Sequence, residues 1–127
     1  MSLVKDKVLL TFSLTKDEIE VLNEHFNKEG AKSCVIIENS MANYTLKEIL
    51  EGEEKNHPKD ELPVEKAIIF NNFEGEKLHK AVTEVRVLLQ SRPILATITP
   101  ISINMKFKDV LEHLIEEREF HKKNSKK

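Results

Sequence analysis

The segment from Ile94 to Arg118 constrains the fold most, because an apolar run there stops at a proline and a patterned helix follows. Pro100 has no backbone N–H and biases the residue before it toward an extended conformation, so a strand is expected to end at Thr99. Beyond this point apolar residues recur at spacings of three and four, as in a helix with one apolar face. These residues are Phe107, Val110, Leu111, Leu114 and Ile115. The segment predicts a strand, a polar elbow and a helix, in that order.

The same succession of strand and helix is predicted four times along the chain. Apolar, β-branched runs predict strands at 8–12, 34–37, 66–71 and 94–99, and amphipathic segments predict helices at 15–30, 45–52, 75–90 and 107–118. Alternating elements of this length are typical of βαβ units in an α/β fold. We therefore predict a single α/β domain over residues 1–121, with two βαβα halves forming a mainly parallel four-stranded sheet and helices packed on it. The charged, proline-containing segment 53–65 is expected to link the halves, and the lysine-rich tail 122–127 to be disordered.

The two halves, 7–52 and 66–119, show a pattern that suggests an internal duplication. A shift of 61 places Leu46–Glu51 on Phe107–Glu112 with every position identical or chemically similar, and a shift of 59 places Lys7–Leu10 on Lys66–Ile69. The alternative is that any two amphipathic βα units look this similar, since geometry fixes the spacing of their apolar residues.

Composition narrows the class of protein. The chain has 127 residues, 33% of them charged, 6% aromatic, with a formal net charge of -2, so nothing in it requires a nucleic-acid partner. The single cysteine, Cys34, lies in a strand-like run and is expected to act as a small buried hydrophobe. One cysteine excludes an intramolecular disulfide, and the N-terminal segment lacks a cleavable signal pattern, which favours the cytoplasm. No apolar run approaches the ~20 residues that span a bilayer, so no membrane partner is expected.

Polar residues gather where the predicted strands end, and ligands of open α/β sheets usually bind beyond the carboxyl ends of the strands. They can form hydrogen bonds, and one of them is a carboxylate. The alternative is that they only cap helices and close turns. The candidate ligand-binding residues are Glu38, Asn71, Asn72, Thr99, Ser102 and Asn104.

No catalytic, metal or cofactor site is predicted. The three glycines stand apart, so a glycine-rich phosphate loop is excluded, and no spacing selects a nucleophile with its base. His113 and Glu117, or Glu117 and His121, are four residues apart and could bind a metal from a helix face. In a run so rich in glutamate and lysine, solvated side chains are the expected reading.

Three motifs resemble a known family. They are AIIFNNF from Ala67 to Phe73, ILATITPISIN from Ile94 to Asn104, and FKDVLEHLIEERE from Phe107 to Glu119. They are similar to an uncharacterised family of small bacterial proteins, mostly from Firmicutes, known as a domain of unknown function (DUF3783-like). This chain has Met105 and Lys106 where the family tends to place Trp and Thr. The resemblance implies a cytosolic bacterial protein and brings no catalytic residues.

These observations favour a non-enzymatic ligand-binding or protein-interaction module that uses the strand-end residues or the exposed face of the last helix. Its partner would be a second copy of the chain or another protein. The alternative is a small enzyme with Glu38 as its acid or base, and the third reading is weak nucleic-acid binding through the basic tail.

Overall fold

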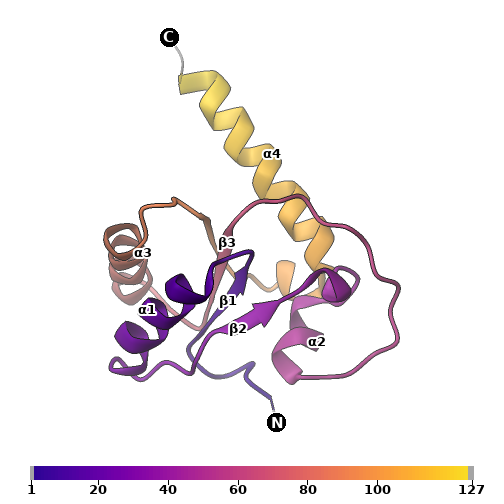
Figure 1. The fold of residues 1–127 in the computed structure, drawn as a ribbon, viewed down its shortest axis with the longest axis horizontal. Helices are drawn as coiled ribbons and strands as arrows, with labels where there is room; N and C mark the ends of the chain where they lie inside the picture. The colour runs from indigo at the N-terminus through magenta and orange to yellow at the C-terminus, as the bar shows by residue number, and fades with distance from the viewer. Residues whose placement is uncertain (1, 126–127) are drawn as a thin grey trace.

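The structure, a computed structural model, describes residues 2–125 and has the α/β architecture that the sequence predicts (Figure 1). Within these residues, four strands form one open sheet, and four α-helices pack on it. Each helix follows a strand, with a short 3-10 turn before α2 and before α4. The elements are β1 (Val8–Phe12), α1 (Lys16–Asn27), β2 (Val35–Ile37), η1 (Asn39–Met41), α2 (Leu46–Glu51), β3 (Ala67–Asn71), α3 (Glu76–Leu88), β4 (Ile94–Thr97), η2 (Ser102–Asn104) and α4 (Phe107–Ser125).

The sheet is mixed, so the prediction of a mainly parallel sheet is wrong. The strand order is β2-β1-β3-β4, and the two strands of each half are parallel. The central strands β1 and β3 are antiparallel, with Leu10 opposite Ile69. Within each half a helix connects the two strands, which favours parallel pairing. The halves are joined by the irregular segment 52–66, which imposes no such direction on β3.

The helices cover both faces of the sheet, giving three layers (Figure 1). Successive residues of a strand point to opposite faces, so each central strand supplies two cores. One core lies under α1 and α3, and the other lies under α2 and α4. The first contains Leu9, Ile68 and Phe70 with Leu22, Phe26, Ala81 and Val85; the second contains Val8, Leu10 and Ile69 with Leu46, Leu50, Phe107 and Leu111.

Helix α4 continues past residue 121, after which the tail was predicted to be disordered. Its first residues, Phe107, Val110 and Leu111, are buried, and its distal half extends away from the sheet (Figure 1). We predicted disorder over 122–127, whereas the helix continues to Ser125; Lys126 and Lys127 lie outside the described residues. None of the described helices combines the length and the apolarity needed to cross a membrane.

Glu18 ties the start of α1 to the second half of the chain. Its carboxylate closes the capping box with Thr15 and also accepts hydrogen bonds from Lys66 Nζ, at 2.9 Å, and from the Ser91 hydroxyl. Burial alone would raise the pKa of Glu18, but the bonds from Ser91, the Thr15 N–H and Lys66 lower it to about 2. The ionised carboxylate is therefore the form that holds these three segments together.

Replacing Glu18 with glutamine is expected to lower the free energy of unfolding by about 1.5–3 kcal/mol at pH 7, the usual contribution of hydrogen bonds to a charged group. Because the folded pKa is depressed, the carboxylate's contribution is present above its ordinary pKa of 4.5 and is lost as the pH falls toward about 2. Urea unfolding at several pH values should show the gap between wild type and variant closing over this window. Glu20→Gln, at an exposed position of the same helix, is the control and should leave stability unchanged. A gap that stays constant with pH would contradict the assignment.

Candidate functional site: the open edge of strand β4

Strand β4 lies at an edge of the sheet and leaves one side of its backbone unpaired. The N–H of Ile94 donates to Lys66 O at 2.8 Å, and the N–H of Ile98 donates to Phe70 O at 3.0 Å. Alternate residues of a parallel strand face the same neighbour, so Leu95 and Thr97 direct their N–H and C=O groups away from β3. These backbone groups are the ones that another strand would pair with.

Cavities flank this edge on both faces of the sheet. A groove of about 620 Å³ lies between β4 and α4, with Ile101 and Leu114 among its apolar residues. A second cavity, of about 440 Å³, lies between β4 and the end of α3 and includes Leu89. Leu95 lines both. The edge therefore offers backbone hydrogen-bonding groups with space for side chains on either side.

Two arginines give the start of this edge a positive charge. Arg86, near the end of α3, and Arg92, in the turn before β4, both line the cavity beside Leu95. Both are exposed, and neither guanidinium group forms an ion pair or a hydrogen bond with any residue in the described range 2–125. A guanidinium without a carboxylate partner is suited to bind an acidic group of a ligand.

Two of the predicted ligand-binding residues, Thr99 and Ser102, lie at the other end of the β4 groove. They hydrogen-bond each other reciprocally: the Thr99 N–H donates to Ser102 Oγ and the Ser102 N–H donates to Thr99 Oγ1, both at 2.9 Å. This is the turn-closing role that the sequence left open as the alternative, in a place that also borders the groove. Asn104 is exposed and is not among the residues that line it.

The structure does not bring Asn71, Asn72 and Glu38 into this site. Asn71 is 4% exposed, and its Nδ2 donates to the backbone oxygens of residues 3, 4 and 6 at 2.9 to 3.2 Å. The side chain of Asn72 donates to Lys5 O. Glu38 is exposed beyond the end of β2, and because β1 and β3 are antiparallel this is the opposite end of the sheet from Asn71 and Thr99. The predicted cluster of strand-end residues is therefore split.

Sequence reasoning missed Arg86, Arg92 and Leu95. The signal was present in Ser91-Arg92-Pro93, a basic turn that enters a strand. Strand order decides whether such a strand is central or at an edge, and the apolar pattern of a strand does not predict strand order.

Cys34 packs half-buried against the core beneath α1 and α3. Burial raises the pKa of its thiol to about 11, so the side chain stays protonated at neutral pH. This environment agrees with the expected packing role.

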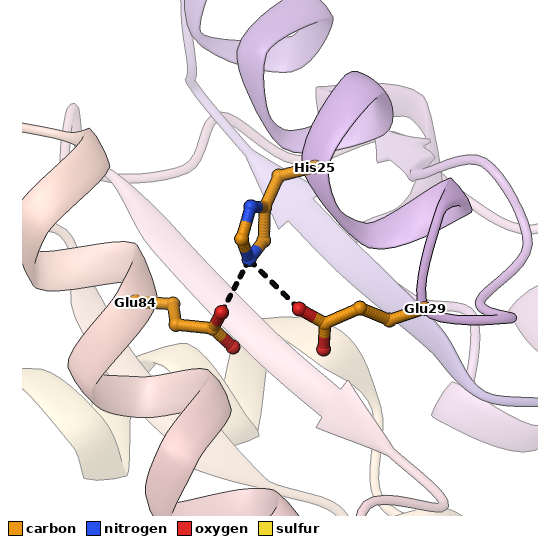
Figure 2. A group of neighbouring side chains, drawn as sticks. All are labelled: His25, Glu29 and Glu84. Carbon is orange, nitrogen blue, oxygen red and sulfur yellow. Dashed lines mark hydrogen bonds and ion pairs between the residues drawn. The ribbon is translucent and has the colours of Figure 1, made fainter.

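A cluster of metal-ligand type joins α1 and α3 on the face of the sheet away from α4 (Figure 2). His25 comes from α1, Glu29 from just beyond its end, and Glu84 from α3. His25 Nε2 lies 3.0 Å from Glu29 Oε2 and 2.5 Å from Glu84 Oε2. The spacing of four between His25 and Glu29 was visible in the sequence, but the third residue is distant in the chain.

Comparison with known families agrees with the resemblance. Residues 66–120 match the family model described as a domain of unknown function (DUF3783). The matched segment covers β3, α3, β4 and most of α4, and therefore the whole of the β4 edge. No curated protein and no solved structure matches the chain.

Proposed function

We propose, from the premise that residues 66–120 carry this domain of unknown function, that the protein is a non-enzymatic interaction module. In this proposal the β4 edge binds an extended, acidic segment of another protein. The observation that carries it is the free backbone of Leu95 and Thr97 between two cavities.

The proposed binding mode is addition of a strand to the sheet. An extended peptide pairs its backbone with an exposed edge, which gives affinity, while alternate side chains enter pockets on the two faces, which gives specificity. On the α4 face such a side chain would meet Ile101 and Leu114, and on the α3 face it would meet Leu89. Both cavities are bordered by apolar residues, so apolar or β-branched side chains are the ones expected at these positions.

Charge supports an acidic partner. Arg86 and Arg92 lie beside the start of β4, and their guanidinium groups have no carboxylate partner within the part of the chain that the structure describes. An aspartate or glutamate of the peptide placed there would form charge-assisted hydrogen bonds. The arginines stand at one end of the edge and the Thr99 and Ser102 hydroxyls at the other, so the two ends favour different peptide residues.

Proline at position 97 tests the proposal. The N–H of Thr97 faces the open edge, so Thr97→Pro removes a donor that an added strand would use while leaving the β3–β4 bonds of Ile94 and Ile98 in place. Peptides selected from a phage-displayed random library would be labelled and titrated by fluorescence anisotropy. We expect enrichment of acidic, β-branched sequences and a loss of affinity of about tenfold in the variant, or about 1.4 kcal/mol.

The matched control is Ile36→Pro, on β2 at the opposite edge of the sheet. Ile36 of β2 is paired with Thr11 of β1 and occupies the position that a shift of 61 places on Thr97. Binding that survives in the β2 variant and weakens in the β4 variant supports the proposal. Equal affinity in all three proteins would place the peptide elsewhere, and an equal loss in both variants would point to general destabilisation.

We further propose that the two halves are an internal duplication. Two pairs of residues in contact across the halves support it, because each pair consists of positions that the sequence shifts relate to each other. Leu10 and Ile69 pair in the sheet and differ by 59. Thr45 and Lys106 form a β-bridge between the starts of α2 and α4 and differ by 61.

The hydrogen bonds around this bridge are reciprocal. Leu46 N–H donates to Met105 O at 3.1 Å, and Phe107 N–H donates to Tyr44 O at 2.8 Å. Leu46 and Phe107 differ by 61, and so do Tyr44 and Met105, so each bond is the counterpart of the other with the two halves exchanged. The parallel registers agree as well. The sheet pairs Leu10 with Val35 in the first half and Ile69 with Ala96 in the second. Leu10 and Ile69 differ by 59, and their partners Val35 and Ala96 differ by 61.

The backbone conformation just after β1 and β3 also supports the duplication. Ser13 and Asn72, which follow β1 and β3 and differ by 59, have φ values of 66° and 67°. Positive φ is uncommon outside glycine, so its occurrence at both positions adds support to the duplication. Aligned sequences of relatives provide the test: their two halves should become more similar toward the root of the tree, and divergence toward the root would exclude duplication.

We also propose a bacterial protein that works in the cytoplasm. The compartment is supported by the single cysteine, whose thiol is held protonated, and the bacterial origin rests only on the three sequence motifs that resemble a family of small bacterial proteins.

A further inference from the structure

The cluster of His25, Glu29 and Glu84 places three side chains that can bind a divalent metal at one point (Figure 2). One nitrogen and one carboxylate oxygen from each glutamate lie within 4.8 Å of one another. These are ligands that Zn²⁺ accepts, and three protein ligands with water in the remaining position is a common arrangement. Within the described residues this is the one group of three such side chains close enough to share an ion.

Without a cation, this cluster has more hydrogen-bond acceptors than donors. Both carboxylates approach the same atom, His25 Nε2, from Glu29 and from Glu84. A ring nitrogen carries at most one proton, so a single N–H faces two acceptors. A divalent cation with neutral histidine would satisfy both carboxylates, and its charge would match theirs.

A second observation comes from the other oxygen of Glu84. Glu84 Oε1 is buried and has no hydrogen-bond partner among the residues that the structure describes, while the side chain as a whole is 20% exposed. A buried carboxylate oxygen without a partner is costly and uncommon in folded proteins. The oxygen belongs to the same carboxylate whose Oε2 faces His25, so a cation bound at this carboxylate could be shared by both oxygens.

We propose that His25, Glu29 and Glu84 bind one Zn²⁺ ion that links α1 to α3. The two helices belong to the two halves of the chain, and they lie side by side over the same face of the sheet (Figure 1). The ion joins them on the surface of that helical layer, with its open coordination position toward solvent. Its role is to hold the halves together, and it is independent of peptide binding at β4.

Isothermal titration with zinc chloride, using the whole chain, tests the site. We expect one ion bound per chain and a Tm that rises by several degrees with zinc, because a ligand that binds the folded state stabilises it. Glu84→Gln preserves the shape of the side chain but is a poor zinc ligand, and should weaken binding at least about tenfold and abolish the rise in Tm. Circular dichroism establishes that the variant is folded before it is titrated.

The matched control is His113→Ala on α4. His113 precedes Glu117 by four residues, the same spacing as His25 and Glu29, and no third ligand approaches them among residues 2–125. The control should bind zinc as wild type does. Binding by the control and not by the Glu84 variant supports the site, whereas equal binding by both variants, loss in the control, or no binding by wild type would overturn it.

Discussion

Replacing Phe107 with alanine is expected to lower the free energy of unfolding by about 3–5 kcal/mol, the typical cost of removing a buried phenylalanine side chain. Phe107 is 1% exposed, at the start of α4. Its ring packs edge to face on Phe12, with 5.2 Å between the ring centroids. The residue fills the core where α2 and α4 meet the sheet, so the neighbouring elements cannot close the cavity without losing their own contacts.

Phe120→Ala provides the control on the same helix. Phe120 is 64% exposed, on the part of α4 that extends away from the sheet, so its removal should change stability by less than about 0.5 kcal/mol. Urea unfolding of both variants makes the comparison. A loss below about 1 kcal/mol for the Phe107 variant would mean that the α4 layer contributes far less to folding than its packing indicates.

Replacing Asn71 with aspartate is expected to cost about 3–5 kcal/mol at pH 7, as for a buried charge left without a partner. The Asn71 amide donates to three backbone oxygens of the N-terminal segment. An ionised carboxylate donates nothing and would face these oxygens with a negative charge. Because the protonated acid can donate one bond, the folded state should raise the pKa of the new carboxyl group. The deficit should therefore shrink as the pH falls below that value and be complete above it.

Asn72→Asp is the matched control. Asn72 is adjacent, exposed, and at φ 67°, a conformation that aspartate tolerates as well as asparagine does. Its loss should be below about 1 kcal/mol and vary little with pH. Similar losses at both positions would show that Asn71 does not organise the N-terminal segment.

The sequence predicted most of the elements of this fold because their signals are local. The capping boxes at Thr15 and Thr45 both form, and both central strands begin and end within a residue or two of the predicted bounds. The direction of β3 could not be predicted in this way. A strand buried on both faces has the same apolar pattern in either direction, and the linker before it has no helix to set the handedness of the connection.

The candidate site was predicted only in part, for a related reason. Thr99 and Ser102 lie in the groove because they follow β4 directly. Glu38 was grouped with them on the assumption that the strands end at one side of the sheet, and a single antiparallel pairing separates them. Contacts such as that between His25 and Glu84 depend on how two helices meet, which periodicity within either helix does not specify.

The antiparallel pairing of β1 with β3 has a consequence for the ancestry of the chain. A polypeptide carrying only the unit of residues 66–120 would leave the inner edge of its buried strand unpaired in water, an arrangement that favours association. It would complete the sheet by joining a second copy through a two-fold rotation. Under the duplication we propose, the present chain is such a dimer fused into one polypeptide. Fusion releases the copies from symmetry, so the β4 edge can specialise for a partner while the β2 edge diverges.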